Sequence, residues 1–259
     1  MARLRRRIGD GLMLATRMRY GGKVTLAAAS VTFNTAPTAY DSTKVASHSF
    51  ASVSIGTANA ARRVVIGVVI GGGSETASGT INSVTCNGDA MTLIKVATPG
   101  NCSIAICDIA ESAMSSPTDT TATIVVGSSG TFGFAQIFSY RVLAYGATVS
   151  QSVTSTSNGS PISLIPSNMS TVANNAVVGV FGISSNDGEA ADDADVAWTT
   201  QMTDADQDAY TGNGSGENAA CASDIFASAN TTFSQRLTCV LATGASHTAM
   251  AAVSWAPNT

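Results

Sequence analysis

The feature that most constrains this fold is a series of short β-type runs, each closed by Gly, Asn, Ser or Pro. Apolar and serine side chains alternate over residues 51–55, which is typical of a strand with one buried face. Residues 64–70 are apolar apart from Gly67 and end at Gly71, which indicates a central strand covered on both faces. Only 12% of residues are charged and 44% are apolar, so the chain can bury a core.

The same kind of run recurs along most of the chain. Further strands are predicted at 23–33, 81–86, 90–96, 104–109, 122–126, 134–143, 149–154, 162–165, 176–183, 196–202, 219–226, 233–241 and 248–255. A loop is predicted from residue 34 through Pro37 to Lys44. Asn87-Gly88 predicts a type I′ hairpin, because this pair readily adopts the positive φ angles of such a turn. Short strands separated by turn residues predict an all-β fold, an antiparallel two-sheet sandwich.

Two of the runs, 64–70 and 176–181, have similar sequences. Two tandem sandwiches of about 110 residues each would explain the similarity. A single jelly roll also has two equivalent halves, and no linker separates the halves here. We therefore expect one β-sandwich domain of jelly-roll type over residues 23–259. The segments expected to be most deeply buried are 64–70, 134–142, Trp198 and Trp255.

The charges are unevenly distributed. Residues 1–23 have seven basic groups and one acidic group, a net charge of +6, whereas the other 236 residues have six basic and sixteen acidic groups, a net charge of −10. Apolar side chains recur at every fourth position near the start, as on one face of a helix, and Gly21-Gly22 provides a joint. We interpret residues 1–22 as a basic N-terminal assembly arm that binds a partner subunit. Its candidate partner-binding residues are Arg3, Leu4, Arg5, Arg6, Arg7, Ile8, Leu12, Arg17 and Arg19.

Common catalytic patterns are missing from the sequence. The only imidazoles belong to His48 and His247, which we interpret as surface or strand-edge residues, and there is no G-x-S-x-G nucleophile elbow. The glycines at 71–73 lack the third glycine and the following helix of a dinucleotide-binding loop. A glycosidase pair among the acidic residues would need aromatic platforms, and only Trp198 and Tyr210 are near. We therefore expect no enzyme and no cofactor.

Nine carboxylates fall within residues 187–217, where Lys and Arg are absent. We expect this stretch to be a long outward loop with one short strand around Trp198. Asp204, Asp206 and Asp208 alternate as the first ligands of a calcium loop do. At the positions where an EF-hand loop has Gly and Glu, this stretch has Ala and Ser. Ca²⁺ at the three aspartates is a weak candidate metal site, and the alternative is a solvated acidic surface.

The five cysteines form no C-x-x-C pair and have no neighbouring His, so we expect no zinc site. Cys239 shares a face with apolar residues, and we interpret it as a small core residue. Cys102 and Cys107 flank the start of a strand. They are candidates for a disulfide with each other or with a neighbouring subunit, and the sequence leaves these alternatives open.

Five segments follow one another in the order RRVVIGVVIGG, INSVTCNGDAMTLIKVA, SIAICDIA, TATIVVGSSG and FGFAQIFSYRVL. This order, with the ending AMAAVSWAP, resembles a β-sandwich module of bacteriophage virion proteins and related bacterial surface proteins. The likeness covers roughly residues 48–257, with the module's V-T-x-N-G hairpin at 84–92 and its aromatic strand at 135–140. It implies a sandwich fold and brings no catalytic group with it. The basic arm departs from the pattern.

Together these observations predict a non-enzymatic structural subunit of a tailed bacteriophage virion, as a capsid decoration, spike-base, fibre or tail accessory protein. We expect a homo-oligomer located in the virion, bound to capsid or tail subunits through its arm and sheet edges. The alternatives are a carbohydrate-binding adhesin module that uses the acidic loop and aromatic residues, and a hydrolase. Membrane and nucleic-acid partners are not expected, because no apolar run reaches eighteen residues and the body is acidic.

Overall fold

The computed structural model describes residues 30–41, 45–72, 79–98, 100, 102–157, 162–164, 169–185, 197–199, 205–211, 217–226, 228, 230–233, 236–239 and 246–258. Strands dominate these residues, and one 3-10 turn, η1 (Glu111–Ala113), interrupts them. Every strand pairing described is antiparallel. The predicted all-β antiparallel sandwich is confirmed. Within this part of the chain, no helix has the length and apolar character needed to cross a membrane.

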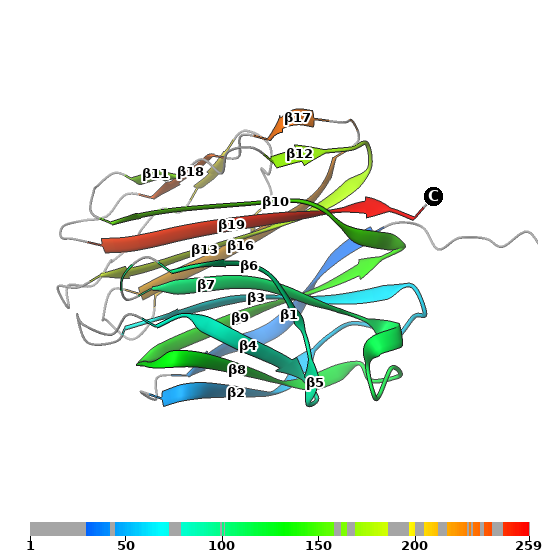
Figure 1. The fold of residues 1–259 in the computed structure, drawn as a ribbon, viewed down its shortest axis with the longest axis horizontal. Coiled ribbons are helices and arrows are strands. Elements are labelled where there is room, and N and C mark those ends of the chain that lie inside the picture. Colours follow the sequence, from blue (N-terminus) through cyan, green and yellow to red (C-terminus); the bar gives the residue numbers. More distant parts are fainter. Residues whose placement is uncertain are drawn as a thin grey trace, which may run out of the picture.

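The first half of the chain forms a sandwich of two sheets (Figure 1). The first inner sheet has the order β1 (Ser30–Asp41), β9 (Phe134–Leu143), β3 (Arg62–Gly71), β7 (Ser103–Ala110) and β6 (Thr92–Ala97). The first outer sheet has the order β2 (Val45–Ser54), β8 (Thr121–Phe132), β4 (Ile81–Cys86) and β5 (Asp89–Ala90).

The second half repeats this plan. The second inner sheet has the order β10 (Tyr145–Ser157), β19 (Ser246–Pro257), β13 (Asn175–Ser185), β16 (Glu217–Phe226) and β15 (Ala205–Thr211). Two small sheets lie beyond it in Figure 1. They are β11 (Ile162–Leu164), β18 (Arg236–Cys239) and β14 (Ala197–Thr199), and the pair β12 (Met169–Thr171) and β17 (Asn230–Phe233).

The strand orders of the two halves match. When β5 is counted with β6, β11 with β12 and β17 with β18, the described strands of each half fill eight positions, and each inner sheet has the order first, eighth, third, sixth, fifth. The outer sheets place the second position beside the seventh and the seventh beside the fourth. This is the strand order of a jelly roll, present once in residues 30–143 and again in 145–257. The single jelly roll expected over 23–259 is therefore corrected to two jelly-roll sandwiches in tandem.

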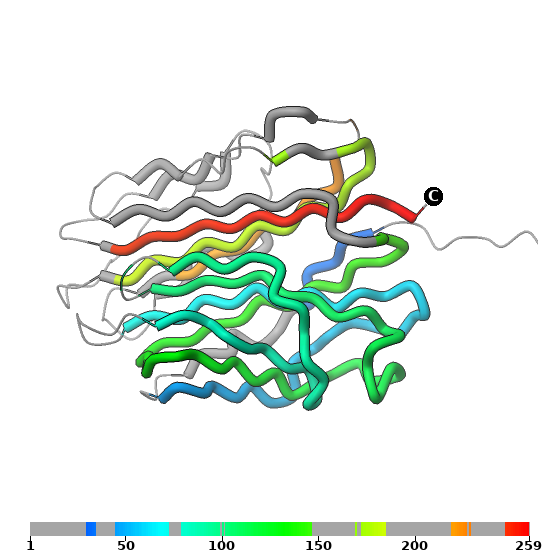
Figure 2. Tube along the Cα trace, in the orientation of Figure 1, coloured from blue at the N-terminus to red at the C-terminus, as the bar shows by residue number. Residues whose placement is uncertain are grey.

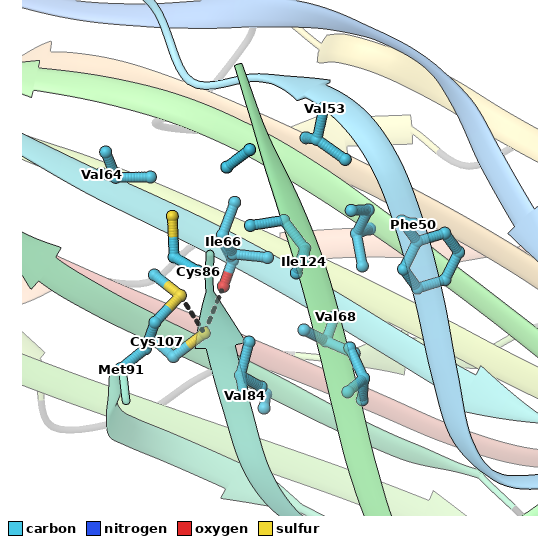
Figure 3. Packing of buried hydrophobic residues seen from close by; sticks show 14 of the residues in the cluster. Phe50, Val53, Val64, Ile66, Val68, Val84, Cys86, Met91, Cys107 and Ile124 are labelled. Carbon is cyan, nitrogen blue, oxygen red and sulfur yellow. Dashed lines mark hydrogen bonds between the residues drawn. The ribbon is translucent and has the colours of Figure 1, made fainter. Parts of the chain in front are cut away.

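Two hydrophobic cores stack on one another. The first lies between the first inner and outer sheets and includes Val64, Ile66 and Val68 from β3 (Figure 3). The second lies between the two inner sheets and joins Val65 and Phe138 to residues of β13 and β19. Because β3 is covered on both faces, it is apolar from Val64 onward, and its predicted central position is confirmed together with that of β9.

Glycine and valine complement each other across the second core. Gly67 pairs with Phe138 across β3 and β9, and adding 113 to both residue numbers gives Val180 and Ala251, which pair across β13 and β19. Gly67 and Val180 therefore occupy equivalent positions in the two halves. A Cβ added at Gly67 would lie 2.5 Å from Cγ2 of Val180. The same shift relates Val69 to Gly182, where an added Cβ would lie 2.6 Å from Cγ1 of Val69. Each valine therefore fills the space left by the other half's glycine.

Two predicted boundaries change. The first strand does not end at Phe33 but continues to Asp41, with a bulge between Asn34 and Ala39 that accommodates Pro37. The predicted hairpin at Asn87-Gly88 is present, with φ angles of 51° and 89°. The strand that follows it is divided, because β5 pairs with β4 and β6 crosses to β7 in the other sheet.

Both ends of the described chain emerge at one end of the molecule (Figure 2). Ser30 pairs with Leu143, Arg62 pairs with the same residue from the other side, and the backbone N–H of Asn258 donates to the carbonyl of Ala144. We call this end the terminal pole. It includes the loop 55–61 and the loop 111–120, named here the two terminal loops.

Candidate assembly surface

One buried arginine forms hydrogen bonds with the backbones of both terminal loops. The side chain of Arg62 is fully buried at the start of β3 and forms an ion pair with Glu111. One guanidinium nitrogen, Nη1, donates to the carbonyl oxygens of Gly56 at 2.7 Å and of Asp119 at 2.9 Å. The other, Nη2, donates to the carbonyl of Pro117 at 3.0 Å. A single buried cation thus fixes the backbones of both terminal loops.

Polar side chains from the β4–β5 hairpin hold the loop 111–120 from its other side. The carboxylate of Asp89 accepts from the backbone N–H of Ser115 at 2.6 Å and from its hydroxyl. These two hydrogen bonds stabilise the charged form and lower the pKa of Asp89. The amide of Asn87 donates to the Asp119 carboxylate at 2.8 Å and accepts from the backbone N–H of Thr123 at 2.7 Å. The loop is therefore anchored at both its middle and its end.

A second buried acid joins the two sandwiches near this pole. Oδ2 of Asp108, on β7, accepts from Nη1 of Arg63 at 2.6 Å. The same oxygen accepts from the indole Nε1 of Trp255, on β19 of the second sandwich, at 3.1 Å. Trp255 is fully buried, as predicted. One carboxylate oxygen thus ties a partly exposed cation of one half to a buried aromatic donor of the other.

Sequence reasoning missed these charged residues. The available signal was an isolated acid, Asp108, in the middle of the apolar run SIAICDIA, and a pair of arginines, Arg62 and Arg63, immediately before a buried strand. An ionised group flanked by core residues is costly unless it is paired, so such a position indicates a buried partner. Its partner cannot be identified from spacing, because Arg62 and Glu111 are 49 residues apart.

The two histidines lie in different settings. His48 is on the edge strand β2, as expected, but it is fully buried, which corrects its interpretation as a surface residue. His247 is half-buried at the start of β19, which lies between β10 and β13 and is not an edge. Its ring packs on the backbone of Gly100 from the first sandwich. Burial lowers the pKa of His247.

The described cysteines are buried thiols. Cys86, Cys102, Cys107 and Cys221 all belong to the cores, and none of them forms a disulfide. Cys102 and Cys107 therefore do not bridge to each other, and a disulfide with a neighbouring subunit stays a prediction. Burial raises the pKa of Cys86 to about 11 and raises that of Cys107 further. Figure 3 shows both of these thiols among apolar side chains. Cys239 is on β18, and its side chain lies outside the described residues.

The remaining predicted sites fall largely outside the described residues. All the candidate arm residues, from Arg3 to Arg19, belong to this undescribed part, as does Asp204. Asp206 and Asp208 are on β15, so the described residues between 187 and 216 belong to two strands, β14 and β15, where one was expected. The calcium site stays a prediction, and no group of three metal-ligating side chains occurs among the described residues. Trp198 is on β14 with its side chain outside the description.

Comparison with known proteins adds no assignment. No protein-family model matches the sequence, and no curated protein is similar to it. The function must therefore be argued from the residues and their geometry.

Proposed function

We propose that this protein is a non-enzymatic structural subunit of a tailed bacteriophage virion, incorporated through its N-terminal arm. The observation that supports this most is the place where the described fold begins. Ser30, eight residues after the arm ends, lies at the same pole as the two terminal loops that Arg62 holds. A basic segment tethered at one pole of a compact double sandwich suits a subunit that is attached by one end.

The buried architecture supports a structural role as well. The charges placed deepest in the described residues, those of Arg62, Glu111 and Asp108, are all hydrogen-bonded to other parts of the chain. They fix loops and join the sandwiches. The carbohydrate-binding alternative would need exposed aromatic residues, and the side chains of its candidates, Trp198 and Tyr210, lie outside the described residues.

The test is incorporation into particles. Particles are prepared from a phage whose genome lacks the gene for this chain. They are then mixed with the purified chain. The full chain is expected to co-sediment with the particles at a fixed copy number. A chain lacking residues 2–20 is expected to stay folded by circular dichroism and to remain in the supernatant. Absence of the full chain from sedimented particles, and from mass spectra of wild-type particles, would refute the proposal.

A further inference from the structure

Side chains from outside the two terminal loops hold both loops in place. The guanidinium of Arg62 contacts the backbones of both loops, and Asp89 and Asn87 hold the loop 111–120 from the side. A buried ion pair stabilises a fold little more than apolar residues of the same volume would. What the planar guanidinium provides is a fixed arrangement of several acceptors at once. The contacts therefore preorganise the loops.

The exposed residues of these loops are all uncharged, and the one partly exposed acid, Asp119, accepts a hydrogen bond from Asn87. The exposed residues are Thr57, Ala60, Ser112, Ala113, Ser115, Ser116, Pro117, Thr118 and Thr120. A rigid loop loses little conformational freedom when it binds, so fixing its backbone in advance increases affinity. Uncharged residues also avoid the cost of removing charges from water at a contact. A partner surface for these loops is expected to be uncharged and able to form hydrogen bonds.

Ser30, the first described residue, lies close to the same loops. Ser30, Leu143 and Arg62 form one row across three neighbouring strands of the first inner sheet. Neighbouring strands are about 4.8 Å apart, so Ser30 lies about 10 Å from the residue that fastens the loops. The chain enters the described fold beside the loops, and the arm ends eight residues before Ser30, so a partner bound by the arm has a high effective concentration at the loops.

We infer that the two terminal loops are a preformed docking face for the same virion subunit that the N-terminal arm binds. The arm supplies a charged tether, and the loops supply an uncharged contact of defined shape. The inference rests on the proposed function and adds the surface that determines how the subunit sits on its partner.

Matched arginine substitutions test the face. Thr118→Arg places a long charged side chain on the exposed part of loop 111–120, and Thr131→Arg makes the same change on the exposed face of β8. Both variants are expected to unfold at the same temperature as the unmodified chain. Thr118→Arg is expected to weaken binding to the gene-deleted particles by about tenfold or more, and Thr131→Arg by less than about twofold. Equal binding by the two variants would overturn the inference while leaving the proposed function intact.

Cross-linking tests whether arm and loop share a partner. The native thiols other than Cys239 are buried, so in a Cys239→Ser background a cysteine introduced by Ser116→Cys or by Thr16→Cys can be labelled selectively with a photoreactive group. Irradiation of the bound particles is expected to link both positions to the same virion protein. Capture of two different virion proteins, or capture at residue 16 alone, would show that the loops are not part of this contact. Failure of the unlabelled full chain to bind particles would instead count against the proposed function.

Discussion

Removal of the Asp108 carboxylate is expected to weaken the join between the two sandwiches. In Asp108→Leu, the side chains of Arg63 and Trp255 both lose their acceptor, but only one of them can bond to water instead. The Arg63 side chain is 20% exposed and can turn to water, whereas Trp255 is fully buried and its indole N–H cannot. An unsatisfied buried donor costs about 1–3 kcal/mol, and loss of the charge-assisted bond to Arg63 adds to this. We therefore expect a loss of about 2–4 kcal/mol in the free energy of unfolding.

Urea unfolding followed by circular dichroism and by tryptophan fluorescence measures this loss. Asp108→Asn keeps an oxygen that can accept from Trp255, so its cost is expected to be about half that of Asp108→Leu. Trp255→Phe removes the donor. Its effect on the free energy of unfolding is expected to be smaller in the Asp108→Leu variant than in the unmodified chain, by about 1 kcal/mol or more. Equal costs for Asp108→Leu and Asp108→Asn, together with additive effects of Asp108→Leu and Trp255→Phe, would refute the reasoning.

Other predictions concern the core, the thiols, protonation and calcium. Phe138→Ala is expected to destabilise the fold by about 3–5 kcal/mol in urea unfolding, because Phe138 is fully buried between the inner sheets. Cys86 and Cys107 are expected to react with a thiol reagent only after denaturant is added, since their pKa values are raised by burial. Because the pKa of His247 is lowered in the folded state, the unfolded chain binds a proton first, so stability is expected to fall as the pH drops below about 6.5. His247→Gln should flatten that part of the pH profile. If Ca²⁺ binds near Asp206, the melting temperature is expected to rise with added Ca²⁺ and fall with chelator, and no shift in either direction would leave only a solvated acidic surface.

The fold was predictable where the pattern of apolar residues indicates which faces of a strand are buried. The run 64–70 is apolar on both faces, and β3 is covered on both faces. The number of sandwiches was not predictable from this pattern, because a two-sided apolar strand has the same sequence whether its second cover is another sheet of its own sandwich or a second sandwich. The hairpin at Asn87-Gly88 was predictable from local turn chemistry, but the crossing of β6 to β7 depends on a partner that follows in the chain.

The candidate site was largely unpredictable for a related reason. The arm is marked by its arginines, which stand together in the sequence. The terminal loops are small and polar, as many surface loops are. Their order comes from Arg62, whose acceptors lie 6, 55 and 57 residues away. Contacts between distant segments that use backbone carbonyls leave no trace in residue identity, because every residue has a carbonyl.

The reciprocal glycines and valines between the inner sheets restrict which halves can associate. Two copies of the first half brought together in the same way would place Gly67 opposite Gly67 and Val69 opposite Val69. The first pairing would leave a gap, and the second would bring four methyl groups into a space that now holds two. Homotypic pairing of the halves is thus disfavoured, whereas the first half accepts the second at both positions. During synthesis on neighbouring ribosomes, this mismatch disfavours association between the first halves of two nascent chains before their second halves are made.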